Sequence, residues 1–284
     1  MKFNPFTAAH LPAFEKDGYV IIKNFLSKEE AQLMYQTAID DDAVSKNSFD
    51  LNDTQGFRTR LALWYTPGDD VYSMYSRSEK AVEAAELILG GTVGHYHSKL
   101  MQKEPHKGGA WEWHQDYGYW YNNGFLFPQM VSIMVALTEA TKENGCMQVI
   151  RGSHKMDRIN HNMTGEQAGA DMEKVEEALK KMELVYVTLE AGDALFFHAN
   201  LLHRSNANLS DKARWSLISV YNLVSNVPYK PEPASCHTPI QKVSNDAIIR
   251  AGKVGFGDST DFLSKEVDLK FKEETLLNNS VIDA

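Results

Sequence analysis

Residues 111–117 (WEWHQDY) place a histidine and a carboxylate two positions apart among aromatic residues. If this segment is an extended strand, His114 and Asp116 project from the same side and can offer ligands to one metal ion. A further histidine, His203, follows a strand expected at residues 193–198. Two histidines and one carboxylate that leave coordination positions open are the ligand set of non-haem Fe(II) oxygenases. We therefore take these three residues as candidate metal ligands.

Several other kinds of catalytic site lack their signatures in this chain. It contains no His-Glu-x-x-His, which zinc proteases carry on a helix, and no Gly-x-Ser-x-Gly of serine hydrolases. It also lacks a glycine-rich phosphate loop. Three classes stay open on these residues. They are an iron oxygenase, a zinc- or nickel-dependent cupin-like enzyme without a cosubstrate, and a jelly-roll protein that binds a ligand without catalysis.

Short strands separated by Gly, Asn, Asp and Pro turns must position these residues. Strands are expected at residues 19–25, 57–65, 93–103, 129–138, 146–150, 184–189, 193–198 and 214–224. Helices are expected at 8–16, at 79–89, at about 170–182, and from a capping box at Ser27 and Glu30 to about residue 39. Residues 40–56 are expected to form a loop. This pattern predicts a mainly β fold with flanking helices, of the sandwich or barrel type.

No repeat or linker divides the chain, so a single domain is expected over residues 1–284. Its N-terminal support spans about residues 1–92, its barrel core about 93–224, and a C-terminal extension of unassigned role about 225–284.

Composition narrows the range of partners. The 29 basic and 38 acidic residues give a net charge of −9, which provides no general attraction for nucleic acid. Two cysteines, Cys146 and Cys236, are too few for a disulfide framework. The sequence shows no signal peptide and no apolar run long enough to span a membrane. A cytoplasmic protein with a small-molecule substrate, and with no nucleic-acid or membrane partner, is the expectation.

The order of several motifs resembles the phytanoyl-CoA dioxygenase family of Fe(II)- and 2-oxoglutarate-dependent oxygenases. The motifs are Asp17-Gly18-Tyr19-Val20, Leu26-Ser27, His114-x-Asp116, Asn144-Gly145-Cys146-Met147, Gly152-Ser153-His154, Gly192-Asp193, His203-x-Ser205 and Arg214. Trp113 and Trp120 beside the first metal motif resemble the ectoine-hydroxylase branch of that family. The resemblance covers about residues 10–222 and implies a double-stranded β-helix, the cupin-like jelly-roll barrel.

The resemblance also implies roles for individual residues. His114, Asp116 and His203 would bind Fe(II), and Arg214 would bind the distal carboxylate of 2-oxoglutarate, which the guanidinium fork matches. Ser205, Ser132 and Trp120 would contact this cosubstrate. Met101 stands where related hydroxylases often carry asparagine. The implied reaction consumes O2 and releases succinate and CO2, with ascorbate as an aid in vitro, and a carboxylate at Asp116 favours hydroxylation over halogenation.

The surroundings of the motif suggest a substrate class. Aromatic residues, among them Tyr117 and Tyr119, could surround an ammonium group, since cations bind over aromatic rings. Arg58 and Arg60 could neutralise an acidic group, and His97 lies on a strand expected to line the pocket. These residues favour a small amine-bearing or zwitterionic metabolite, such as an amino acid derivative, a betaine-like compound or an aminophosphonate. Hydroxylation of an acyl-CoA thioester is the alternative.

Overall fold

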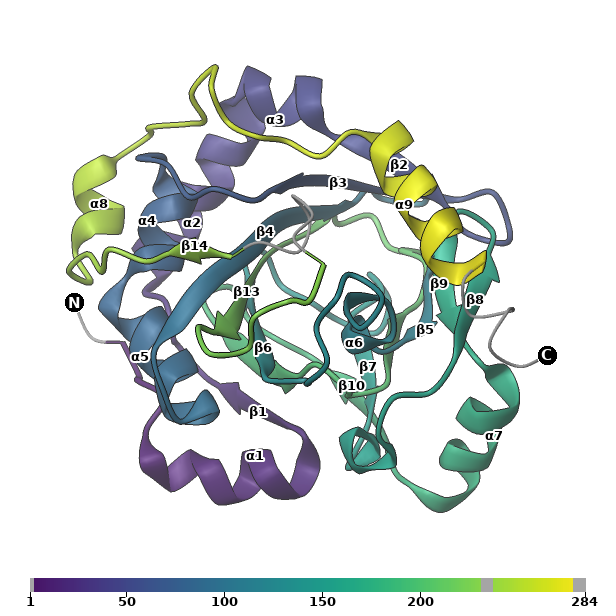
Figure 1. Ribbon diagram of the computed structural model, residues 1–284. Helices are drawn as coiled ribbons and strands as arrows, with labels where there is room; N and C mark the ends of the chain where they lie inside the picture. The colour runs from purple at the N-terminus through teal and green to yellow at the C-terminus, as the bar shows by residue number, and fades with distance from the viewer. Residues whose placement is uncertain (1–2, 231–236, 278–284) are drawn as a thin grey trace.

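Runs of buried aliphatic and aromatic residues form the largest sheet of the molecule. The computed structural model describes residues 3–230 and 237–277 (Figure 1). The eight strands of this sheet are β1 (Tyr19–Ile22), β2 (Phe49–Asn52), β3 (Arg58–Trp64), β4 (Val93–Lys103), β6 (Met130–Ala136), β11 (Ala194–His198), β13 (Arg214–Leu223) and β14 (Thr238–Pro239). Their order is β1-β11-β6-β13-β4-β3-β2, with β14 beside β4. Strands β4 and β13 pair along their whole lengths, which places Arg214 opposite Lys103.

A second sheet packs against one face of the first. It contains β5 (Trp111–His114), β7 (Met147–Ile150), β10 (Leu184–Val187) and β12 (His203–Ser205), in the order β10-β7-β12-β5. Met134, Ile218 and Val220 of the large sheet share one apolar core with Met147 and Val149 of the small sheet. All named strands pair antiparallel. The expected double-stranded β-helix is confirmed.

N-terminal helices cover the other face of the large sheet (Figure 1). They are α1 (Leu11–Asp17), α2 (Lys28–Asp40), α4 (Val71–Arg77) and α5 (Glu79–Leu89). Because side chains alternate along a strand, Ile133, Val135 and Leu217 point to these helices while their neighbours point between the sheets. The capping box of α2 is confirmed, with the Ser27 hydroxyl accepting from the Glu30 amide and the Glu30 carboxylate accepting from the Ser27 amide.

The prediction of a loop at residues 40–56 is wrong. This segment contains α3 (Asp42–Asn47) and β2, because the Asp41 carboxylate caps α3 and the alternating Phe49 and Leu51 are buried. Helix α4 and the hairpin of β8 (His161–Thr164) and β9 (Gln167–Ala170) are further elements that the sequence pattern does not indicate. The other predicted strands and helices occur at their expected positions, most with shorter ends.

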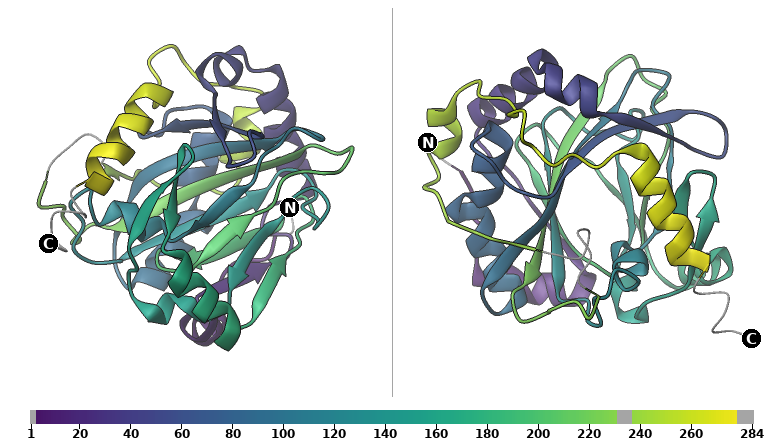
Figure 2. Two further views of the ribbon diagram at one scale, coloured as in Figure 1. Left: turned by 90° about the vertical axis from the view of Figure 1, so that its right-hand side faces the viewer. Right: turned by 45° about the horizontal axis from the view of Figure 1, so that its top comes forward.

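The chain after residue 225 also contains regular structure. Besides β14 it forms α8 (Ala247–Ala251) and α9 (Lys265–Leu277), and α9 lies beside β8 and α6 (Asp116–Trp120) (Figure 2). The charged helix predicted at 170–182 is α7 (Met172–Lys181). Cys146 is a buried free thiol, and Cys236 lies outside the described residues. Within the part of the chain that the structure describes, no helix has the length and apolarity needed to cross a membrane.

Candidate metal and cosubstrate site

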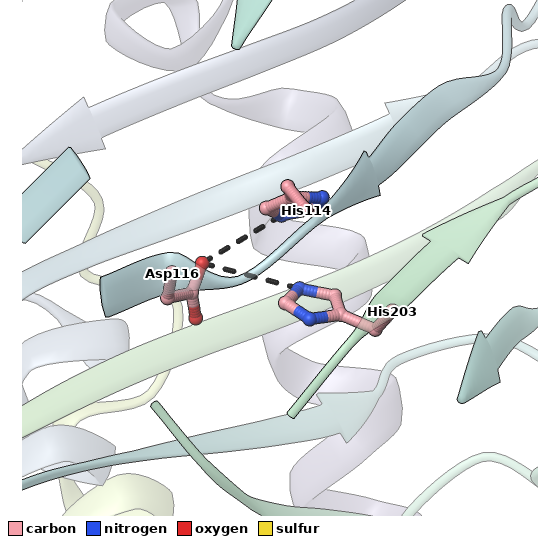
Figure 3. Close-up of side chains that lie close together, drawn as sticks. All are labelled: His114, Asp116 and His203. Carbon is pink, nitrogen blue, oxygen red and sulfur yellow. Dashed lines mark ion pairs between the residues drawn. The ribbon is translucent and has the colours of Figure 1, made fainter. Parts of the chain in front are cut away.

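Three buried side chains converge between the two sheets (Figure 3). His114 ends β5 and His203 begins β12, and the two residues are direct partners across the strand pair. Asp116 Oδ1 lies 3.7 Å from His114 Nε2 and 3.9 Å from His203 Nε2. One potential ligand atom of each residue lies within 4.8 Å of the others. This spacing suits a single metal ion bound by all three.

The interpretation of His114 and Asp116 as neighbours on one strand face is wrong. The strand ends at His114, and Asp116 is the first residue of α6. Gln115 fixes the turn between them, because its side-chain amide donates to the carbonyls of Asp157 and Asn200. Its backbone N–H donates to His161 Nε2. A buried polar turn, rather than strand alternation, thus brings the carboxylate to the imidazoles.

Hydrogen bonds orient both imidazoles for metal binding. Nδ1 of His114 lies 2.8 Å from the Glu112 carbonyl, and Nδ1 of His203 lies 2.9 Å from the Leu201 carbonyl. Since a carbonyl only accepts, each Nδ1 carries the proton and each Nε2 presents its lone pair to the triad. Burial lowers the pKa of both histidines, which favours the neutral form that metals require.

The Asp116 carboxylate is held in its ionised form. Burial opposes ionisation, but His203 and Lys99 nearby lower the pKa of Asp116 below its usual value. The Tyr119 hydroxyl donates to Oδ1 at 2.7 Å and the Ser132 hydroxyl donates to Oδ2 at 3.0 Å, and both bonds act in the same direction. An oriented carboxylate and two neutral imidazoles fit Fe(II) among the transition metals that this ligand set binds.

A cavity opens beside the triad. Both histidines line it together with Ser205 and Arg214, and Met101, Met134 and Met147 form apolar walls. Met101 stands where related hydroxylases often carry asparagine. It therefore presents a thioether to this cavity in place of an amide.

Arg214 is a buried cation that lacks an acidic partner. Its side chain donates to the Gly145 carbonyl, and its Nε has no hydrogen-bond partner among the described residues. Within the same residues, no ion pair to Arg214 occurs. Burial lowers the pKa of Arg214 to about 10, so the guanidinium stays charged at neutral pH. A buried charge normally has a partner, which makes an anionic ligand the natural complement here.

A larger cavity lies next to the first. Its walls include His97, Trp111, Tyr119 and Trp120, and the Lys99 side chain lines both cavities. His97 is 6% exposed and its Nε2 has no hydrogen-bond partner among the described residues. The position of this cavity beside the triad makes it the candidate substrate pocket.

The structure does not bring every residue singled out above to these cavities. Arg58 and Arg60 lie on the face of β3 opposite to Leu61 and pair with Asp50. The Tyr117 hydroxyl donates to the Phe125 carbonyl in the core.

Ser132 and Trp120 are two further predicted residues that lie away from the smaller cavity. The Ser132 hydroxyl donates to Asp116, and Trp120 lines the larger cavity. The sequence reasoning also misses Tyr65, Asp268 and Lys272, which line the larger cavity. The four-residue spacing of Asp268 and Lys272 was a usable signal, because such residues share a helix face.

Known proteins share both the sequence pattern and the fold. The family model described as phytanoyl-CoA dioxygenase (PhyH) matches residues 14–216. The chain is 27% identical over 242 residues to an ectoine dioxygenase of Sphingopyxis alaskensis, covering 80% of this chain and 79% of the relative. It is 33% identical over 181 residues to an L-proline trans-4-hydroxylase of Streptomyces griseoviridis, covering 57% of this chain and 67% of the relative.

A solved structure shows the same fold. The crystal structure of EctD from S. alaskensis with bound Fe superposes with a TM-score of 0.70 at 24% identity, covering 84% of this chain and 89% of that one. The matched residues 14–216 include all three triad residues and Arg214. The chain belongs to the phytanoyl-CoA dioxygenase family and is a 2-oxoglutarate-dependent non-haem iron dioxygenase.

Proposed function

We propose that His114, Asp116 and His203 hold Fe(II), and that Arg214 and Ser205 hold the distal carboxylate of 2-oxoglutarate. The buried Arg214 guanidinium carries this proposal, because it has no acidic partner among the described residues and opens on the cavity that both imidazoles line. A dicarboxylate can then place one end on Arg214 and reach the metal with the other. The larger cavity takes the substrate, which we propose to be a small polar metabolite that carries an amine.

Iron bound with 2-oxoglutarate and O2 supplies the hydroxylation of a substrate C–H bond, with release of succinate and CO2. The chain itself positions the reactants. Tyr119 and Ser132 hold both oxygens of Asp116, so the carboxylate keeps one orientation. The methionine walls of the smaller cavity exclude water from the space between Arg214 and the triad.

Two observations support the substrate class. The relatives reported above are named for action on ectoine and L-proline, which are small molecules that carry both a cationic nitrogen and a carboxylate. Trp111, Tyr119 and Trp120 line the larger cavity, and aromatic faces attract an ammonium group. Arg58 and Arg60 are not part of this proposal, because they pair with Asp50 on the other side of β3.

A substrate panel tests the proposal. Purified protein with Fe(II), 2-oxoglutarate and ascorbate is offered amino acids, betaines, aminophosphonates and acyl-CoA thioesters, and succinate is measured. We expect stimulation by an amine-bearing acid and none in the His203→Ala variant. The exposed His106→Ala variant is the matched control and should keep wild-type turnover.

Stimulation by acyl-CoA thioesters alone would refute the substrate class and assign the aromatic walls to packing. Wild-type turnover in His203→Ala would refute the metal assignment.

A further inference from the structure

A C-terminal segment that the family model does not cover closes one side of the larger cavity. Leu263 lines the cavity and its amide donates to the Leu63 carbonyl of β3 at 2.9 Å. The Lys265 ammonium lies 2.8 Å from the Glu166 carboxylate between β8 and β9. These contacts fix the start of α9, which lies beside α6 and β8 in Figures 1 and 2. The segment thus forms part of the pocket wall.

Charged groups of both signs face this cavity. Lys99 is 8% exposed, and within the described residues its ammonium has no ion-pair or hydrogen-bond partner; the Trp111 ring lies 5.8 Å away. On α9, Asp268 and Lys272 form an ion pair through Asp268 Oδ2. Both side chains of the pair are largely buried, at 16% and 13% exposure. The cavity therefore offers a buried cation on β4 and a mostly buried carboxylate on α9.

The Asp268 carboxylate has capacity for a second cation. A carboxylate accepts about four hydrogen bonds, and no described residue donates to Oδ1 of Asp268. Burial raises the pKa of the Tyr65 hydroxyl, and the charge of Asp268 raises it further. Burial and the charge of Asp116 raise the pKa of the Tyr119 hydroxyl, to which Asp268 adds a smaller effect in the same direction. The same two rings line the cavity, so a cation beside Asp268 would also lie near aromatic faces.

We propose that Asp268 of α9 binds the ammonium group of the substrate while Lys99 of β4 binds its acidic group. This inference rests on the proposed function, since it assigns the two ends of the substrate in the same cavity. A substrate that bridges the two charges lies across the cavity that Tyr119 also lines, and the Tyr119 hydroxyl donates to Asp116 of the triad. A compound without the amine would leave the Asp268 carboxylate desolvated and only partly paired, so the site selects against it.

The experiment measures substrate-stimulated succinate formation with three zwitterionic probes, L-proline, ectoine and 2-aminoethylphosphonate. N-acetyl-L-proline and N-acetyl-2-aminoethylphosphonate, which lack the cationic nitrogen, are the matched compounds. We expect at least one zwitterion to stimulate the wild-type enzyme and an N-acetyl compound to fail. Asp268→Asn should raise the KM for the active zwitterion by about tenfold or more, the scale of one hydrogen bond to a charged group.

A charge exchange separates recognition from helix stability. The double variant Asp268→Lys/Lys272→Asp keeps an ion pair at the same helical spacing but moves the carboxylate by one turn. If Asp268 binds the substrate, this variant keeps the wild-type melting temperature and shows the raised KM. Glu266→Gln, an exposed change on the same helix, should leave KM and kcat unchanged.

Three results would overturn the inference: an unchanged KM in Asp268→Asn, a normal KM in the exchange variant, or stimulation by no zwitterion. In each case the uncoupled conversion of 2-oxoglutarate to succinate, measured without probe, stays intact. Absence of that Fe(II)-dependent conversion in the wild-type protein would instead refute the proposed function. The two failures are therefore distinguishable.

Discussion

At the scale of single residues, Arg214 distinguishes an active site from a packed core. Its guanidinium is buried, charged and without an acidic partner among the described residues, and it shares a cavity with two imidazoles. A core arginine at this depth would need a carboxylate from the protein to offset its desolvation. Here the chain leaves that role to a ligand, and the first prediction follows from it.

Arg214→Met should raise the apparent KM for 2-oxoglutarate by at least about a hundredfold. Loss of one partner from a buried ion pair costs about 3–5 kcal/mol, and about 1.4 kcal/mol corresponds to tenfold. Succinate formation measured against 2-oxoglutarate concentration gives the constant. Arg204→Met is the control, because Arg204 lines the same cavity but stacks on Trp113 and bonds to Gln148.

An equal apparent KM for 2-oxoglutarate in Arg214→Met and in the wild-type enzyme would contradict this role. So would an equal shift in Arg204→Met, since the effect would then follow from the net charge of the cavity and not from one guanidinium.

The residues that could be read from the sequence are those in local motifs. Patterns of residue type and spacing pointed to His114, Asp116, His203 and Arg214. In the structure both histidines and Arg214 line one cavity, and Asp116 completes the triad beside it. The spacing of Asp268 and Lys272 indicates only a shared helix face, and the place of Asp268 at the cavity comes from the long-range position of α9. Arg58 and Arg60 pair with Asp50 away from the cavity lining, because strand phase predicts a shared face but not which face borders the pocket.

At the scale of elements, one buried ion pair joins two helices that support the large sheet. Glu30 of α2 accepts from the Ser27 amide with one oxygen and lies 2.7 Å from the Lys80 ammonium of α5 with the other. Both side chains are at most 3% exposed. The same carboxylate thus caps α2 and holds α5 beside it.

Glu30→Gln should lower the free energy of unfolding by about 3–5 kcal/mol, because it leaves the Lys80 ammonium buried without its anion. Urea denaturation of both proteins measures the difference. The double variant Glu30→Gln/Lys80→Met should recover part of the loss, since it removes the unpaired charge. A loss below about 1 kcal/mol in the single variant, the range of exposed pairs, would contradict a structural role for this pair.

Elements with a strong local signal were predictable, and weak ones were not. The helix after Ser27 carries its capping box, and the strand at residues 93–103 has the observed bounds. In contrast, β2, β8 and β9 are as short as the predicted strands β1 and β7 but lack their runs of aliphatic and β-branched residues. The turn at Gln115 could not be predicted from the local sequence, because the Gln115 side chain bonds to residues 42 and 85 positions away along the chain.

At the scale of the whole molecule, two cavities lie side by side, and the triad histidines line the smaller one. The smaller one extends to Arg214 and the larger one to α9, and Lys99 lines both. The net charge of −9 gives no hint of an acidic ligand, yet cations lie buried at both cavities. Local burial, and not overall charge, therefore decides which ligands this fold can bind.

The central claim is that the chain is a dioxygenase that uses 2-oxoglutarate at this triad. Incubation with Fe(II), 2-oxoglutarate and ¹⁸O₂, followed by mass spectrometry of succinate, tests it most directly. The reaction transfers one atom of O2 to succinate and the other to the hydroxylated product, so the account predicts one ¹⁸O atom in each succinate molecule. The label should be absent when Asp116 is replaced by alanine. Unlabelled succinate from the wild-type protein, or no succinate at all, would contradict the account.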